Sequence, residues 1–302
     1  MIIIKKLKNY YNKMIEKINY RKNMVLNKVR LLIQNLFLKF YMPRNKELKK
    51  IIIENRKFLK TQQPIFSKNE FDENQYGMSY QNFKNINKEV SSFTTYSDLL
   101  NFIINNLYKR KVNYLEVGSS VMKNFVQILN YVENSTLYCF DINEIPQKYR
   151  NLFIDKNIKN TGRLLSSKVK SNNIHYFKGN VLSELDAQEF KENLNIKFDL
   201  IFSDALHIPD AVLSEFANII TPNLSDEFTI YYDDLDFPGL ENTFFDIFND
   251  LKSLDKVYAT TFYIYGWMGQ YEKVHKNGII STHNLEDFFK HSKIRLPRQK
   301  FY

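Results

Sequence analysis

The sequence is poor in cysteine, in glycine and in long apolar runs. One cysteine, Cys139, stands among 302 residues. It excludes a disulfide framework and any zinc site built from cysteines, and it is typical of a reducing compartment. Uncharged stretches near the N-terminus, such as residues 31–38, run about eight residues, far below the ~20 that a membrane-spanning helix needs. Lysines interrupt the first apolar run, so we expect no secretory signal and a cytoplasmic location, with attachment to a membrane surface left open.

Acidic residues are scarce in one part of the chain only. Residues 1–60 hold 17 Lys and Arg but three acids, whereas residues 61–302 hold 26 Lys and Arg and 30 acids. The formal net charge of +10 therefore combines a strongly basic N-terminal segment with a mildly acidic remainder. The two parts are expected to face different partners.

The basic segment has the periodicity of helices. Apolar residues recur every three or four positions over residues 4–40, which predicts one face of a long helix that ends before Pro43. A second basic helix is expected over residues 46–60, so residues 1–60 form a basic helical arm. Its apolar face could pack on its own domain or on a second copy in a homo-oligomer. The arm could instead lie on an anionic membrane surface or follow a nucleic-acid backbone.

Beyond the arm the pattern changes twice. Residues 61–92 lose periodicity and are expected to form a connector or a lid. From 93 to 285, short apolar runs alternate with helical stretches, which predicts an α/β domain with a mostly parallel sheet covered on both faces. Residues 286–302 are left as a C-terminal tail. The predicted strands of the parallel part cover residues 112–118, 136–141, 174–177, 198–204 and 228–232.

Each of these predicted strands ends in small or polar residues. In a parallel sheet the carboxyl ends share one edge, where ligands bind in open α/β folds. A strand, a tight turn at Gly118 and a helix bring backbone N–H groups close to a ligand, and Asp141 at the next strand end is placed to accept both hydroxyls of a ribose. No Gly-rich phosphate loop is present, which argues against a nucleoside triphosphate. The residues at the strand ends are Glu116, Gly118, Asp141, Asn180, Asp204, Asp233 and Asp234.

Over residues 93–285 the sequence resembles the class I S-adenosylmethionine-dependent methyltransferases. The resemblance implies a Rossmann-like sheet of seven strands with a C-terminal antiparallel hairpin, and S-adenosylmethionine as the cofactor. It implies cofactor contacts from Glu116, Gly118, Ser119 and Ser120 at the methionine end, from Asp141 at the ribose, from Asn180 and Val181 beside the adenine, and from Asp204. The first motif lacks its usual later glycines, so a binding module without catalysis is an alternative. The long gap between Asp141 and Asn180 implies an insertion around residues 148–170.

The acids after the fourth and fifth predicted strands resemble those of metal-dependent O-methyltransferases. The resemblance implies a divalent cation such as Mg²⁺ on Asp204, Asp233 and Asp234, because a hard cation neutralises clustered carboxylates and lowers the pKa of a bound hydroxyl. His207, with a near-neutral pKa, is the expected general base beside Asp204. Glu272 and His275, in the loop of the closing hairpin, are second candidates for base or substrate contact.

The expected reaction is O-methylation of a sugar or another small hydroxylated acceptor. An RNA or protein methyltransferase that holds its acidic partner with the basic arm is the competing hypothesis. Against it, Ser203-Asp204-Ala205-Leu206 stands where amino-group methyltransferases carry an Asn/Asp-Pro-Pro-aromatic signature.

Overall fold

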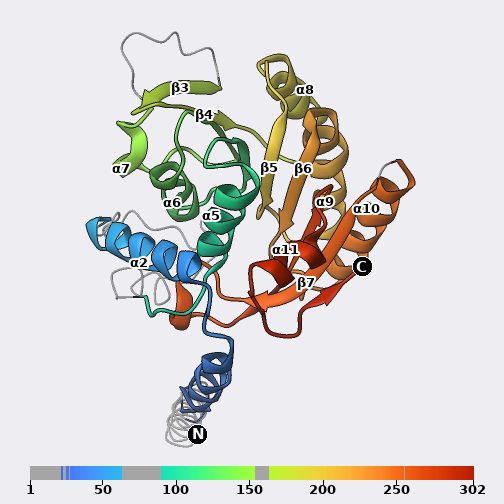
Figure 1. Cartoon of the computed structure of the whole chain (residues 1–302). Coiled ribbons are helices and arrows are strands. Elements are labelled where there is room, and N and C mark those ends of the chain that lie inside the picture. Colours follow the sequence, from blue (N-terminus) through green and yellow to red (C-terminus); the bar gives the residue numbers. More distant parts are fainter. Residues whose placement is uncertain (1–21, 23–24, 27, 63–89, 154–162, 255) are drawn as a thin grey trace, which may run out of the picture. The chain divides into compact units, whose positions relative to one another are not determined.

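The computed structural model describes residues 22, 25–26, 28–62, 90–153, 163–254 and 256–302. The chain divides into two units, residues 1–42 and residues 43–302 (Figure 1). Helix covers the described residues of the first unit up to residue 38 and passes into a 3₁₀ turn, η1 (Lys39–Tyr41). The rest of the predicted long helix, and residues 63–89 of the predicted connector or lid, lie outside the described residues. Among those described, no helix is long and apolar enough to cross a bilayer.

The second basic helix belongs to the folded domain and not to the arm. Helix α2 (Lys46–Thr61) begins at Asn45, whose side-chain oxygen accepts the backbone N–H groups of the first turn. Its buried face carries Leu48, Ile51 and Ile52, which join the same apolar core as helix α5 (Tyr96–Leu107). The structure therefore divides the chain at Met42, and the predicted boundary at residue 60 is corrected, because the apolar face of α2 is covered by its own domain.

The domain is built on one nine-stranded sheet with the order β3-β4-β2-β1-β5-β6-β8-β7-β9. Strands β4, β2, β1, β5 and β6 run parallel, whereas β8 pairs antiparallel with both β6 and β7. The α/β class, the mostly parallel sheet and the closing hairpin are thus confirmed. The strands are β1 (Asn113–Val117), β2 (Thr136–Asp141), β3 (Leu164–Val169), β4 (Asn172–Lys178), β5 (Phe198–Ser203), β6 (Leu224–Tyr232), β7 (Tyr258–Ile264), β8 (His275–Ser281) and β9 (Lys300–Phe301).

The predicted number of seven strands was wrong, because each edge of the sheet gains one strand. The insertion expected around residues 148–170 contains helix α7 (Gln147–Arg150) and supplies β3, which pairs antiparallel with β4. At the other edge β9 pairs with β7. The residues left as a tail therefore complete the sheet, and helix α11 (Leu285–His291) packs its Leu285 and Phe289 into the core.

Apolar side chains alternate along the strands and fill two cores, one on each face of the sheet. On β1, Tyr114 joins the core that holds α2, α5, α6 (Lys123–Tyr131) and α11. Leu115 and Val117 point to the other core, which holds α8 (Glu184–Glu192), α9 (Pro209–Glu215) and α10 (Leu240–Leu254). A π-helical segment, η4 (Phe216–Ile220), follows α9. The short 3₁₀ turns η5 (Thr221–Asn223) and η6 (Gly269–Tyr271) complete the described elements. With both faces covered, ligands reach the sheet at its strand ends.

Candidate functional site

The carboxyl ends of the parallel strands lie side by side, as the sequence predicted. The backbone N–H of Gly118 donates to a backbone carbonyl of β2 at 2.9 Å. The N–H of Asp204 donates to a carbonyl of β1 at 2.9 Å, and that of Asp233 donates to a carbonyl of β5 at 3.1 Å. These bonds continue the sheet past the strand ends. Gly118, Asp204 and Asp233 are therefore held in fixed positions along one edge, with Asp141 at the end of β2 beside them.

The turn after β1 is closed tightly. Gly118 has φ +84°, and a Cβ built on it would lie 2.1 Å from the carbonyl oxygen of Asp204. Ser120, two residues on, also has a positive φ of 45°. Only glycine fits at position 118, because a side chain there would collide with backbone that cannot move aside. This turn connects the predicted cofactor half of the edge to the acids after β5.

Asp141 organises that turn from the neighbouring strand. Its carboxylate accepts the backbone N–H of Ser120 at 2.7 Å and that of Asn143 at 2.8 Å, and the hydroxyl of Ser119 lies 3.4 Å away. Burial raises the pKa of Asp141, although these hydrogen bonds oppose the shift. The structure thus brings together Ser119, Ser120 and Asp141, three of the residues predicted to contact the cofactor.

Glu116 lies beneath the turn and not at its surface. It is 1% exposed, and its carboxyl accepts the hydroxyl of Tyr114 at 2.6 Å and the amide of Asn124 at 2.8 Å. Burial raises its pKa to about 8 in spite of those bonds. At neutral pH the side chain is therefore held as a neutral acid, joined to the first turn of α6.

Asn180 and Val181 follow β4, next to the end of β2. The Asn180 side chain accepts the backbone N–H of Leu182 at 3.0 Å, and Val181 is buried. The intervening Gly179 donates its N–H to the carbonyl of Asp141 at 2.8 Å. The predicted adenine segment is therefore adjacent to the predicted ribose acid.

At the other end of the edge, carboxylates and imidazoles form what we call the acid–histidine cluster. Within it, His207 lies between two acids: its Nε2 is 3.1 Å from Asp204 Oδ1, and its Nδ1 is 3.4 Å from Asp234 Oδ2. The cluster contains four carboxyl groups and two imidazoles. Its members are Asp204, His207, Asp233, Asp234, Glu272 and His275.

His275, at the start of β8, links the remaining acids. Its Nδ1 contacts Asp234 Oδ1 and lies 3.9 Å from Asp233 Oδ1, and its Nε2 lies 3.7 Å from Glu272 Oε2. The amide of Asn277 donates to Asp233 from the same strand. All the residues predicted for catalysis or for the metal therefore meet in one place.

The acids hold protons on the imidazoles. Burial by itself would lower the pKa of His207, but its hydrogen bond to Asp204 and the charges of Asp204 and Asp234 outweigh burial and raise the pKa to about 9. The near-neutral value expected from sequence was wrong, because three carboxylates converge on this ring. Burial raises the pKa of Asp233, whereas the hydrogen bond from His275 lowers that of Asp234.

The donor set of this cluster fits a hard divalent cation. Among the described residues, Asp233, Asp234 and His275 each offer one ligand atom, and these atoms all lie within 4.8 Å of one another. The Nε2 of His275 is buried and makes no hydrogen bond. Carboxylate oxygens with one imidazole suit Mg²⁺ or Mn²⁺. The predicted ligand Asp204 is not one of these three residues; His207 lies between it and Asp234.

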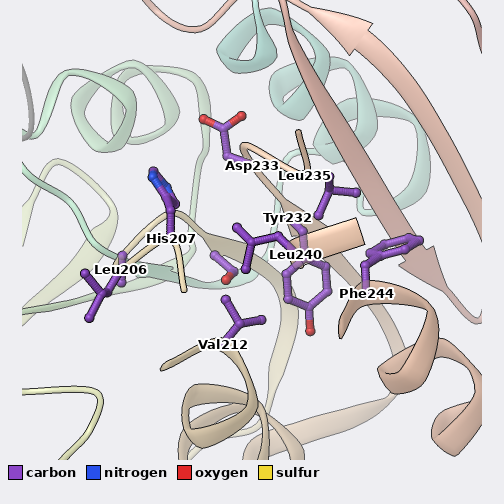
Figure 2. A pocket seen from close by; sticks show the side chains of 10 residues that line it. Leu206, His207, Val212, Tyr232, Asp233, Leu235, Leu240 and Phe244 are labelled. Atoms are coloured by element: carbon purple, nitrogen blue, oxygen red, sulfur yellow. The ribbon is translucent and has the colours of Figure 1, made fainter. Parts of the chain in front are cut away.

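An apolar pocket adjoins the cluster. Figure 2 shows His207 and Asp233 beside a group of aliphatic and aromatic side chains. Ser203, at the end of β5, is its small polar member. The pocket thus offers an apolar surface directly next to charged groups. Its apolar lining comes from Ala205, Leu206, Val212, Tyr232, Leu235, Leu240 and Phe244.

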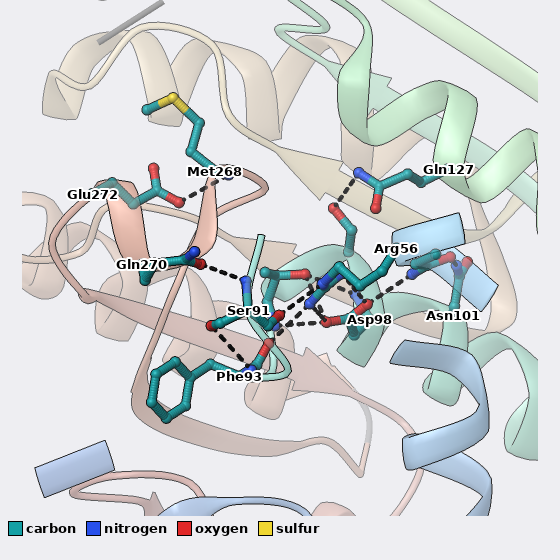
Figure 3. Close-up of polar contacts among 12 residues, drawn as sticks. Arg56, Ser91, Phe93, Asp98, Asn101, Gln127, Met268, Gln270 and Glu272 are labelled. Atoms are coloured by element: carbon teal, nitrogen blue, oxygen red, sulfur yellow. Dashed lines mark hydrogen bonds and ion pairs between the residues drawn. The ribbon is translucent and has the colours of Figure 1, made fainter. Parts of the chain in front are cut away.

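The loop that carries Glu272 is fastened to α2 through a short strap, residues 90–95 (Figure 3). The backbone N–H of Ser91 donates to the side chain of Gln270 at 2.6 Å. Arg56 of α2 donates to the carbonyls of Ser91 and Phe93 at 2.9 and 2.8 Å, and pairs with Asp98 at 2.6 Å. Sequence reasoning missed this support, because the charge pattern of a basic helix does not reveal which of its cationic side chains is buried. The sequence signal that could have identified Asn277 was the alternation of side chains between the two faces of β8.

Comparisons with known proteins find similar solved structures at low sequence identity. No family model matches the sequence, and no curated protein matches it. Similar solved structures include an O-methyltransferase from Bacillus cereus in complex with SAH, at 11% identity over 83% of this chain and 96% of that chain, with a TM-score of 0.43. A protein described as a caffeoyl-CoA O-methyltransferase from Staphylococcus aureus has 16% identity over 76% of this chain and 99% of that chain, with a TM-score of 0.42.

A protein described as an O-methyltransferase from Klebsiella pneumoniae has 12% identity over 83% of this chain and 96% of that chain, with a TM-score of 0.40. All three TM-scores lie below 0.5, so the site described above rests on the strand order and side-chain geometry of this chain itself.

Proposed function

We propose that the chain is an S-adenosylmethionine-dependent methyltransferase that methylates an oxygen of a sugar or another small hydroxylated molecule. The observation that carries the proposal is the contact between the Gly118 turn and Asp204. Through this contact, the turn with Ser119, Ser120 and Asp141, which we propose as the nucleoside site, adjoins the loop that carries Asp204 of the acid–histidine cluster. A methyl donor on one side and a hydroxyl acceptor on the other would then be neighbours.

The residues around the turn support a cofactor site. Backbone N–H groups of the Gly118 turn can approach a ligand closely because no side chain intervenes. The Asp141 carboxylate, held by Ser120 and Asn143, is oriented to accept ribose hydroxyls. When bound, S-adenosylmethionine would supply a methyl group on a positively charged sulfur. An acceptor oxygen would attack the methyl carbon and displace the sulfur as the leaving group.

The acid–histidine cluster supports binding and deprotonation of the acceptor. Asp233, Asp234 and His275 would hold a divalent cation, which when bound polarises an acceptor hydroxyl. A cation on Asp233 and Asp234 would offset part of the negative charge that raises the pKa of His207. The neutral imidazole, oriented by Asp204 at the margin of the apolar pocket, would then be placed to receive the hydroxyl proton. The pocket's Leu206 and Val212 would exclude water from this side of the acceptor.

Calorimetric titration with S-adenosylhomocysteine tests the cofactor half. We expect binding by the natural chain and at least tenfold weaker binding by Asp141→Asn, which keeps the shape of the side chain but removes its charge. Asp226→Asn, an exposed position on β6, is the matched control and should bind as the natural chain does. Absence of binding by the natural chain would refute the proposal.

Titration with Mn²⁺, followed by electron paramagnetic resonance, tests the metal half without needing the acceptor. Asp233→Asn and His275→Ala should each weaken Mn²⁺ binding more than tenfold. Asp236→Asn, exposed and three residues along from Asp233, is the matched control. Equal affinity in all variants would contradict the assignment of these ligands.

Release of S-adenosylhomocysteine distinguishes the alternatives. Release that depends on Mg²⁺ and on small hydroxylated compounds supports the proposal. Release with RNA or protein alone would favour a methyltransferase that uses the basic arm, and cofactor binding without release from any acceptor would favour a binding module.

A further inference from the structure

The first unit of the chain exposes an unusually large amount of apolar side chain. We call its helical residues 22, 25–26 and 28–38 the arm helix. Leu32 and Ile33 are 60% and 62% exposed, and Phe40, just beyond in η1, is 84% exposed. Val25, Leu26, Val29, Leu36 and Phe37 are exposed as well. Contiguous apolar surface of this kind marks an interaction site.

These side chains occupy one continuous face. At 100° per residue, the seven exposed apolar positions from Val25 to Phe37 fall within an arc of about 140°. A coiled-coil seam is narrower, since it uses two positions in seven. The width therefore favours a flat apolar partner over one facing helix.

Cations flank the apolar arc on both sides. Lys28 and Lys39 fall beyond one edge of the arc, and Arg30 falls beyond the other. Lys22 projects within the arc but at the N-terminal end of the arm helix, where a long side chain can extend to the polar side. The sequence has no acid between Glu16 and Glu47. The whole surface is thus apolar in the middle and positive at both margins.

We propose that the arm helix binds to an anionic lipid bilayer, lying in the plane of the interface. Its aliphatic and aromatic face would enter the boundary of the acyl chains, and Lys28, Arg30 and Lys39 would meet lipid phosphates and carboxylates. A second copy fits less well, because like charges would face each other with no acid to pair them. A nucleic-acid backbone would leave the wide aliphatic face uncovered.

Sedimentation of the full chain with vesicles tests this proposal. We expect binding to phosphatidylcholine vesicles that contain about 30% phosphatidylserine, weaker binding to pure phosphatidylcholine, and loss of affinity as salt is raised. Lys28→Gln and Lys39→Gln should each weaken binding to the anionic vesicles roughly fivefold.

A matched pair of variants separates the apolar face from net charge. Leu32→Glu places a carboxylate in the middle of the arc and should weaken vesicle binding more than tenfold. Lys28→Gln, at an exposed position beyond the edge of the arc, lowers the charge of the same helix by the same one unit and should weaken binding only about fivefold. Equal losses in the two variants would overturn the proposal, because they would leave charge alone as the cause.

Three further outcomes would also overturn it. The first is that the natural chain fails to bind either kind of vesicle. The second is that it binds single-stranded RNA tightly and does not bind vesicles. The third is that light scattering shows a dimer that Leu32→Glu dissociates. Titration with S-adenosylhomocysteine should be the same for both variants, which confirms that the domain is folded and keeps this test independent of the proposed activity.

Discussion

The turn at Gly118 lies directly against the backbone of Asp204, with 2.1 Å between the carbonyl oxygen of Asp204 and the position of a Cβ on residue 118. This contact joins the two halves of the site. It also means that the geometry of the cofactor half depends on a residue whose side chain belongs to the acid–histidine cluster.

Gly118→Ala should therefore weaken binding of S-adenosylhomocysteine at least tenfold. It should also lower the free energy of unfolding by at least about 1 kcal/mol. The added methyl group must displace backbone at the edge of the sheet. Gly239→Ala is the control, because Gly239 has a similar φ of +87° but its Cβ would meet the side chain of Pro209. If Gly239→Ala impairs cofactor binding as strongly, the effect comes from backbone strain in general and not from the turn. Calorimetry and urea unfolding measure the two quantities.

Arg56→Ala should lower the free energy of unfolding by about 3–5 kcal/mol, because it leaves the fully buried carboxylate of Asp98 without its cation. Lys57→Ala, one residue on and exposed, should change stability by less than about 0.5 kcal/mol. Urea unfolding compares the two variants. A small effect at Arg56 would mean that α2 contributes little to holding the strap and the Glu272 loop.

Glu116 should make stability fall as the pH rises. Its pKa is about 8 in the folded protein, against about 4.5 when exposed. The contribution is complete below pH 4.5, declines as the unfolded chain loses its proton first, and is gone above about pH 8. Glu116→Gln should flatten this decline, which urea unfolding at pH 5, 7 and 9 would measure.

Buried Glu215, whose pKa is also about 8, should account for part of the slope that remains in Glu116→Gln. The control is Glu184→Gln, an exposed position on α8, which should keep the full slope of the natural chain. An unchanged slope in Glu116→Gln would show that Glu116 is ionised in the folded state.

His175 should act in the opposite direction. Burial lowers its pKa to about 4, where it stacks on Tyr138 with ring centroids 4.2 Å apart. Below pH 6.5 His175 is protonated in the unfolded chain but stays neutral in the folded chain down to about pH 4. The free energy of unfolding should therefore fall as the pH falls from 6.5 to 4. His175→Phe should keep the stacking and remove that dependence. Persistence of the same acid-side decline in the variant would assign it to other groups.

The sequence by itself determined the α/β class, the order of the five parallel strands, and the edge of the sheet where polar residues gather. These follow from local patterns: apolar runs of strand length alternate with helical periodicity, and each strand ends in a polar residue. The closing hairpin and the candidate residues Gly118, Asp141, Asp204 and Asp233 were therefore accessible without coordinates.

Only the tertiary structure decided which of these residues touch. It added β3 and β9 at the edges, since pairing between distant segments leaves no local pattern. It buried Arg56 against Asp98 and attached α2 to the domain. It also surrounded His207 with acids from the loops after β5 and β6, which raises a pKa that spacing along the chain suggested was near neutral. Hydrophobic periodicity is encoded within a few neighbouring residues, whereas burial and charge depend on side chains that the fold brings together from positions far apart in sequence.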